Sequence, residues 1–373
     1  MKQILSFLAL AIVAGNSSAA MGPQFRIRDL GPAYIQNQAL LYGGSVDHIN
    51  DRGVSVGVAP FAGEPYAAVW YPGQGAQSLG SPGTDSAAMG VSAAGVIAGC
   101  YGDFYSYGYT TACLWYPSSD TAVPQTPVPL ASPGYPYALA SGVNCSGTVC
   151  GQVRNDSGDL EAVIWQAGQM FKLGILPGKS VSCCDSNSLI NEFGQVVGFS
   201  AEDLWAGRSQ AFLWTPYSPN GTSGQLMPMP RDNSIAYAIN NYGSVCGTFI
   251  DPDDKRFHEF VWRPAYGNAA TEGTFFDLGT PAGKDCIPFG INDLDETVGE
   301  VETGGTNYTN RAFLYIFGKG RFDLNRCLVN GAGWVLYVAN SINDRGQIVG
   351  MGNLNGAWRS FELTPIDDYD GQY

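Results

Sequence analysis

Apolar and polar positions alternate in short runs along the chain, and glycine-containing turns separate these runs. One nine-residue phrase occurs seven times: a strand ending at Ile-Asn or an equivalent pair, a tight turn, and a second strand. Its closing glycines lie 42, 52, 47, 49, 52 and 51 residues apart, which indicates seven repeated units. The copies are INDRGVSVG (49–57), VSAAGVIAG (91–99), VNCSGTVCG (143–151), INEFGQVVG (190–198), INNYGSVCG (239–247), INDLDETVG (291–299) and INDRGQIVG (342–350).

The fifth position of the phrase is glycine in six copies, which suits a left-handed backbone in a tight turn. Asp295 takes this position in the sixth copy, and aspartate tolerates that conformation better than most residues. The asparagine of the phrase can bond to amides of its own turn. We therefore interpret the repeated asparagines as turn residues and not as catalytic residues.

Two further phrases predict the remaining strands of each unit. A strand rich in aromatic and β-branched residues follows each turn, at 67–72, 112–117, 162–165, 211–214, 259–262, 312–315 and 360–363. A strand of the type FDLG then occurs at 77–80, 171–174, 275–279 and 321–324. Together with the strand before each turn, every unit has four short antiparallel strands, which is typical of a propeller blade. The tryptophans that recur in the second phrase are expected in the core.

The two ends of the repeat region complement each other. The segment FRIRDLG at 25–31 is a copy of the last phrase with nothing before it, and the repeats end after the second phrase near Pro365. The N-terminal strand is thus expected to complete the last blade and to cover its free edge. The predicted fold is an all-β, seven-bladed β-propeller, a single domain over residues 21–366.

The phrases resemble the HAF-repeat family of probable extracellular, bacterial repeat proteins. INEFGQVVG with QAFLW, and INDRGQIVG, are close to the family pattern, whereas the HAF triplet becomes His258-Glu259-Phe260 in the fifth unit. The resemblance covers nearly all of residues 25–365 and implies secretion. It implies no catalytic residue.

The N-terminus has the order of a secretory signal peptide. Lys2 precedes an apolar run at 4–14, and the small residues 17–20 follow. Residues 1–20 are therefore expected to be removed, and residues 367–373 form an acidic tail. The mature protein is expected to be soluble and either extracellular or periplasmic.

Net charge and missing motifs exclude several functions. Nineteen basic and 33 acidic residues give a charge of −14 (19 − 33), which disfavours nucleic acid and anionic membrane surfaces as partners. The chain has two histidines, so a multi-histidine metal site is excluded, and it lacks a P-loop, a dinucleotide fingerprint and the G-x-S-x-G elbow. The run Asp251-x-Asp253-Asp254 lacks the glycine and distal glutamate of a calcium loop. No cofactor and no metal are predicted.

Nine cysteines point to disulfides in an exported protein. Cys145 and Cys150 flank one turn, and Cys100 and Cys113 are expected on neighbouring strands. We expect the disulfides Cys145–Cys150 and Cys100–Cys113, and the odd number leaves at least one thiol unpaired.

The loops between the second and third strands of each unit are rich in acidic and aromatic residues. The second unit has the densest set, which is the candidate ligand-binding site: Tyr101, Asp103, Phe104, Tyr105, Tyr107 and Tyr109. Two functions fit this face. One is a secreted binding or scaffold protein that recognises a glycan or another extracellular ligand. The alternative is a polysaccharide-active hydrolase or lyase that uses carboxylates of the same face. No catalytic motif favours the enzyme, but a close carboxylate pair with a perturbed pKa in a central cleft would do so.

Overall fold

The computed structural model describes residues 22–33, 45–82, 85–103, 109–119, 121–184, 186, 188–203, 208–268, 271–281, 283–302 and 310–366. These ranges form strands β1–β28 and one short 3₁₀ helix, η1 (Leu324–Arg326), so the predicted all-β class is confirmed. The expected signal peptide and acidic tail lie outside the described residues. Within those ranges, no helix is long and apolar enough to cross a membrane.

Five sheets have four strands each. The first is β2 (Val46–Ile49), β3 (Ser55–Phe61), β4 (Glu64–Trp70) and β5 (Gln77–Ser78). The second sheet contains β14 (Val181–Cys183), β15 (Val196–Ala201), β16 (Ser209–Pro216) and β17 (Gly224–Asp232). The third sheet contains β18 (Ser234–Ile239), β19 (Val245–Ile250), β20 (Phe257–Pro264) and β21 (Gly273–Gly279). The fourth sheet contains β22 (Cys286–Ile291), β23 (Thr297–Val301), β24 (Arg311–Ile316) and β25 (Gly320–Asp323). The fifth sheet contains β26 (Trp334–Ile342), β27 (Ile348–Leu354), β28 (Ala357–Pro365) and β1 (Phe25–Pro32).

An eight-stranded sheet holds the remaining strands. It contains β6 (Asp85–Val91), β7 (Ile97–Gly102), β8 (Thr110–Trp115), β9 (Val128–Pro129), β10 (Tyr137–Val143), β11 (Val149–Arg154), β12 (Leu160–Gln166) and β13 (Gln169–Lys172). A single parallel pair, Tyr137 with Thr110, joins its two halves of four strands. The chain thus forms seven groups of four strands, which we number in chain order from β2–β5 (group one) to β26–β28 with β1 (group seven).

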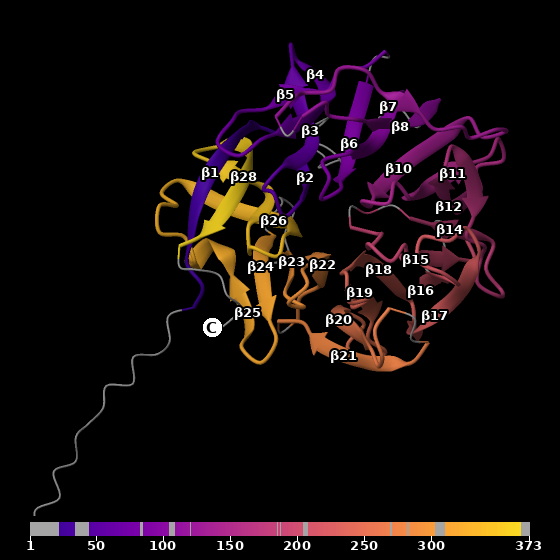
Figure 1. The fold of residues 1–373 in the computed structure, drawn as a ribbon. Coiled ribbons are helices and arrows are strands. Elements are labelled where there is room, and N and C mark those ends of the chain that lie inside the picture. Colours follow the sequence, from indigo (N-terminus) through magenta and orange to yellow (C-terminus); the bar gives the residue numbers. More distant parts are fainter. Residues whose placement is uncertain are drawn as a thin grey trace, which may run out of the picture.

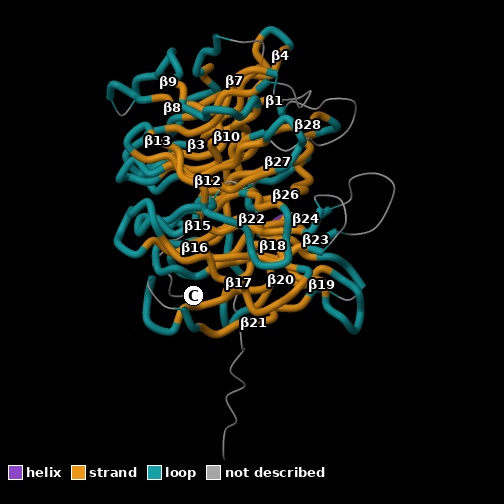
Figure 2. The backbone as a smooth tube through the Cα atoms, turned by 90° about the vertical axis from the view of Figure 1, so that its right-hand side faces the viewer, coloured by secondary structure: helices purple, strands orange, loops and turns teal. Residues whose placement is uncertain are grey.

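The groups follow one another around a common centre, from indigo to yellow in Figure 1, in a propeller-like arrangement. Figure 2, which views the molecule from the side, shows the strands between two flanks that carry most of the loops. The first and last strands along the chain are neighbours, as predicted. β1 pairs with β28 in an antiparallel register that places Phe25 opposite Pro365 and Ile27 opposite Leu363.

The recurring phrases supply the core between neighbouring groups. Trp70, Trp115, Trp165 and Trp262 are almost completely buried, which confirms that the repeated tryptophans are core residues. The closing glycine of the phrase faces the backbone of the preceding strand: a Cβ at Gly99 would lie 2.0 Å from the Ala87 carbonyl oxygen. The same close approach recurs at Gly151 and Gly299, which explains glycine at this position. In the turn itself Asp295 has φ 60°, the left-handed conformation that its place in the phrase predicts.

Neither predicted disulfide is formed in the structure, in which no two cysteines are joined. Cys100 lies opposite Ala112, and Cys113 lies opposite Gly99, so the two cysteines are one residue out of register. Side chains alternate across a strand, and the two thiols therefore point to opposite faces of the sheet. Cys145 is exposed in its turn, whereas Cys150 is buried in β11 opposite Gly142.

Candidate functional site

The seven phrase turns meet at one end of the strand groups. The asparagine in six of them connects its group to the next, and group two has Ser92 in its place. Asn50 accepts hydrogen bonds from the amides of Arg52 and Val54 in its own turn, both at 3.0 Å, which confirms its interpretation as a turn residue. Its Nδ2 also donates to the carbonyl of Ser92 in the next group at 2.8 Å. The equivalent donors are Asn144 to Asn191, Asn191 to Asn240, Asn240 to Asn292, Asn292 to Asn343, and Asn343 to Asn50. This second bond was not predicted, since nothing local in the phrase indicates it.

The residue after each asparagine forms a second series of bonds between groups. Its side chain accepts a hydrogen bond from the backbone amide at the same position of the preceding group. The pairs are Cys145 N to Glu192, Glu192 N to Asn241, Asn241 N to Asp293, Asp293 N to Asp344 and Asp344 N to Asp51, at 2.7–3.2 Å. Ala93 occupies this position in group two and has no side-chain acceptor to offer. The acidic residues of the phrase therefore stabilise the contacts between neighbouring groups.

A cavity of about 290 Å³ lies between these turns. Its lining combines the isoleucines and asparagines of the phrase with His48, Asp51, Glu192, Asp293 and Asp344. Every group contributes to it, so the cavity lies at the centre of the arrangement. We call the end of the strands that carries the phrase turns and the loops after the third strands the turn face.

The carboxyl of Asp344 has a pKa raised to about 6, because the group is half-buried and because Asp51 and Asp293 lie beside it. Burial lowers the pKa of His48 to about 4, although Asp51 opposes that effect. The Nδ1 atom of His48 is 3.3 Å from the amide of Val91, from which it accepts a hydrogen bond. His48 is therefore neutral at physiological pH and does not offset the acidic charge of the cavity.

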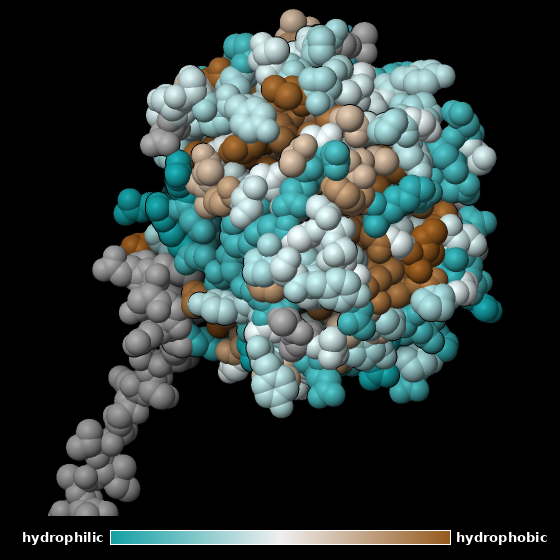
Figure 3. All heavy atoms as spheres, turned by 45° about the vertical axis from the view of Figure 1, so that its right-hand side comes forward, coloured by the Kyte–Doolittle hydropathy of each residue, from teal (hydrophilic) through white to brown (hydrophobic). Residues whose placement is uncertain are grey.

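Exposed tyrosines lie on the same face as this cavity, outside its lining. Tyr116, Tyr217 and Tyr266 follow the ends of third strands, and Tyr242 belongs to a phrase turn; all four are exposed, with Tyr266 at 86%. Antiparallel topology puts the ends of first and third strands at the same end of a sheet, so these tyrosines lie on the turn face. They are spread over groups two, four and five. Hydrophobic surface is likewise divided into small patches on the side of the molecule that Figure 3 presents.

The candidate site predicted from sequence lies at the opposite end, in the loop between β7 and β8. Phe104, Tyr105 and Tyr107 fall outside the described residues. Asp103 is exposed, and its amide donates to the carbonyl of Tyr109 at 2.9 Å across the base of the loop. Tyr101 packs against the core, whereas Tyr109 is 78% exposed. The structure thus gives these two aromatic residues different environments.

No family model matches the chain, and no curated protein matches it. Among solved structures, the chain is similar to one described as YCF48 bound to D1 peptide. The two share 10% sequence identity with a TM-score of 0.47, over 93% of this chain and 96% of the other.

Proposed function

We propose that the chain is a seven-bladed β-propeller that acts as a binding or scaffold protein and engages its ligand with the turn face. The seven groups would be the blades, and β1 would close the last one. Two series of hydrogen bonds support the closed ring, since both run from group three to group seven and return to group one from Asn343 to Asn50 and from Asp344 to Asp51.

The observation that carries the binding role is the set of exposed tyrosines on the face that also holds an acidic cavity. Tyrosine provides a large, rigid contact area with a polar tip and loses little conformational entropy on binding, and it is enriched at recognition surfaces. Carboxylates at the centre suit a ligand that brings hydroxyl or cationic groups. The ligand class proposed is an extracellular protein segment or a glycan.

The export of the protein is part of this proposal. The signal-peptide pattern at residues 1–20 and the resemblance to HAF repeats support an extracellular or periplasmic location. A formal net charge of −14 favours solubility outside the cytoplasm and disfavours nucleic acid as a partner.

One observation favours the enzymatic alternative, a polysaccharide hydrolase or lyase. Asp344 combines a raised pKa with two neighbouring carboxylates in the central cavity, a pattern used by general acids. However, a carboxylate oxygen of Asp344 and one of Asp51 each already accept a hydrogen bond from a backbone amide. The cavity is also at the small end of the size range of ligand sites, about 300–1,000 Å³. Binding without chemistry is therefore the proposed function.

The test is a glycan array and a displayed random-peptide library probed with the mature protein, followed by variants on the best binder. Tyr217→Ala with Tyr266→Ala should weaken binding at least tenfold without lowering the Tm. Tyr109→Ala is the matched control, an exposed tyrosine at the other end. Loss of binding only in the control, or no binder at all, would overturn the proposal. Polysaccharide depolymerisation that disappears in Asp344→Asn would establish the enzyme instead.

A further inference from the structure

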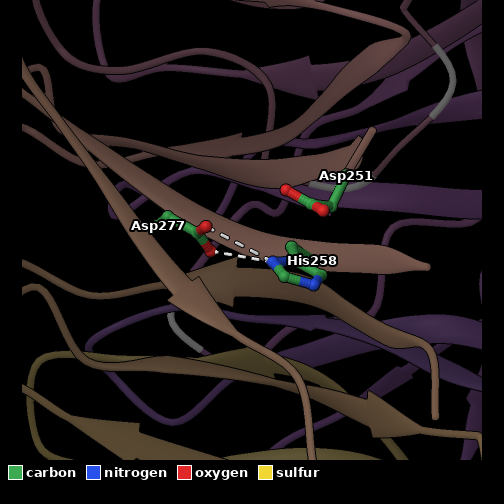
Figure 4. Close-up of side chains that lie close together, drawn as sticks. All are labelled: Asp251, His258 and Asp277. Atoms are coloured by element: carbon green, nitrogen blue, oxygen red, sulfur yellow. Dashed lines mark hydrogen bonds and ion pairs between the residues drawn. The ribbon is translucent and has the colours of Figure 1, made fainter. Parts of the chain in front are cut away.

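One imidazole and three carboxylates come together in group five, at the end of the sheet opposite the turn face. Asp251 directly follows β19, Asp254 belongs to the turn that leads into β20, His258 lies in β20, and Asp277 lies in β21. Figure 4 shows Asp251, His258 and Asp277 converging, with the Asp277 carboxylate bonded to the imidazole ring. None of these residues belongs to the cavity described above.

The distances suit a shared cation. Nδ1 of His258 lies 3.1 Å and 3.3 Å from the two carboxylate oxygens of Asp277. One ligand atom from each of Asp251, His258 and Asp277 can be chosen so that all three lie within 4.8 Å of one another. Ligand atoms about 2.0–2.1 Å from a tetrahedral zinc ion are about 3.3 Å apart, so small side-chain movements would enclose an ion.

The second nitrogen of the imidazole is also held. Nε2 of His258 lies 3.2 Å from the Asp254 carboxylate. A proton on Nε2 that is donated to Asp254 leaves the lone pair of Nδ1 free, and this carboxylate–histidine arrangement is the one that orients metal-binding histidines. The ring of Phe249 packs edge-on against the imidazole, with centroids 5.5 Å apart, and fixes its plane.

Other groups of the same chain have charge-balanced pairs at the equivalent positions. Lys172 pairs with Glu161 at 2.7 Å in group three, and Arg359 pairs with Asp29 at 3.4 Å in group seven. Group five instead surrounds one histidine with carboxylates.

The two basic residues of the group-five turn are engaged elsewhere. Lys255 donates to the carbonyl of Pro252, and Arg256 pairs with Asp285 at 3.7 Å. The cluster therefore has an excess of negative charge even when the imidazole is protonated.

We propose that Asp251, His258 and Asp277 bind one divalent transition-metal ion, with zinc as the best-suited class, and that Asp254 is a positioning residue for His258. One nitrogen and two oxygens form a mixed donor set that favours such an ion over calcium, which prefers oxygen ligands alone. The three ligands leave a coordination position open to water. Binding to Nδ1 releases a proton whenever the imidazole is charged.

The experiment is a titration of the metal-free full chain with Zn²⁺ by calorimetry and with Co²⁺ by visible absorbance. We expect one ion per chain and a cobalt spectrum that reports a nitrogen ligand. His258→Gln and Asp251→Asn should each weaken zinc binding at least tenfold, and Asp254→Asn should weaken it by about 10–100-fold. Glu161→Gln, which breaks the equivalent pair of group three, is the control and should leave binding unchanged.

Circular dichroism and the Tm of each metal-free variant separate loss of the site from loss of the fold. Asp251→Asn keeps an oxygen that can accept the amide of Asp253, so this variant is expected to fold even if His258→Gln does not. Absence of zinc binding at millimolar concentration would overturn the proposal. Zinc binding that the His258, Asp251 and Asp254 variants all leave unchanged, or a stronger response to Ca²⁺ than to Zn²⁺, would also overturn it.

Discussion

The carboxylate of Glu259 lies 2.6 Å from the guanidinium of Arg321, and this ion pair joins group five to group six. Glu259 is fully buried, and Thr297 donates a further hydrogen bond to it. Arg321 also donates to the carbonyl of Gly279 at 3.2 Å and stacks on the Phe313 ring. The contact between these two groups therefore depends on charges as well as on apolar packing.

Replacing Arg321 alone should be costly. Arg321→Met leaves the Glu259 carboxylate buried without its partner, and we expect the free energy of unfolding to fall by about 3–5 kcal/mol. The double variant Glu259→Leu with Arg321→Met should recover most of the loss, because no charge remains to be buried. Urea unfolding measures both values. A double variant as unstable as the single one would show that the pair's geometry, rather than its charge, holds the groups together.

Asp344→Asn should change stability in a pH-dependent way. The native pKa of about 6 is above the unfolded value, so this carboxyl favours folding most below about pH 4 and loses that contribution as the pH rises through 6. Asparagine keeps an acceptor for the amide of Asp293 and already occupies the equivalent position as Asn241. The variant should be more stable than the parent at pH 8, by about 1 kcal/mol after solvent screening, and equally stable at pH 4. Thermal unfolding across this pH range is the measurement, and an equal shift at both pH values would contradict the pKa argument.

Asn343→Ser should isolate the bond between groups seven and one. Ser92 is the natural example, because its hydroxyl accepts the amide of Val96 in its own turn at 3.1 Å. A serine at 343 would keep a turn acceptor but could not reach the carbonyl of Asn50. We expect a loss of about 1 kcal/mol, in line with one buried hydrogen bond. Asn343→Ala removes both functions, and chemical denaturation should show a larger loss. A serine variant as stable as the parent would mean that the bond to Asn50 contributes nothing.

The thiols provide a test of the cysteine assignment. In denaturant, nine equivalents should react with a thiol reagent, because no disulfide is formed. In the native protein only Cys145 is exposed, and its pKa is raised by partial burial and by the neighbouring Glu192 carboxylate. One slow equivalent is therefore expected, faster at higher pH. Glu192→Gln should accelerate the reaction of Cys145. Fewer than nine reactive equivalents in denaturant would show that a disulfide is present.

Much of the fold could be predicted because the repeated phrases encode local geometry. Asp295 adopts the left-handed conformation that the other copies assign to glycine, and the segment at 25–31 finds its partner because it completes a phrase. The disulfide predictions were wrong because two cysteines on neighbouring strands can bond only when their side chains lie on the same face of the sheet. Cys100 and Cys113 are on neighbouring strands, but a one-residue offset, which loop length does not reveal, places them on opposite faces.

The candidate sites were harder to predict than the strands. Composition counts the aromatic residues of a loop but does not tell a packed ring such as Tyr101 from an exposed one such as Tyr109. The contact between His258 and Asp277 links two strands 19 residues apart. Alignment of the repeat phrases would have found it, since Glu161 and Lys172 occupy the same two positions in group three.

The pairing of Phe25 with Pro365 also imposes an order on folding. Groups one to six can assemble from strands that are close in sequence, but β1 has to wait for a partner that lies at the other end of the repeats. Until β28 has formed, β1 has no partner strand and its backbone amides are unpaired. The seventh group then lacks β1, which is its outer strand. The pairing of β1 with β28 is thus a long-range contact that forms last and lowers the chain entropy at the end of folding. We expect this step to be slow, and it is the stage at which strands of different chains can pair wrongly.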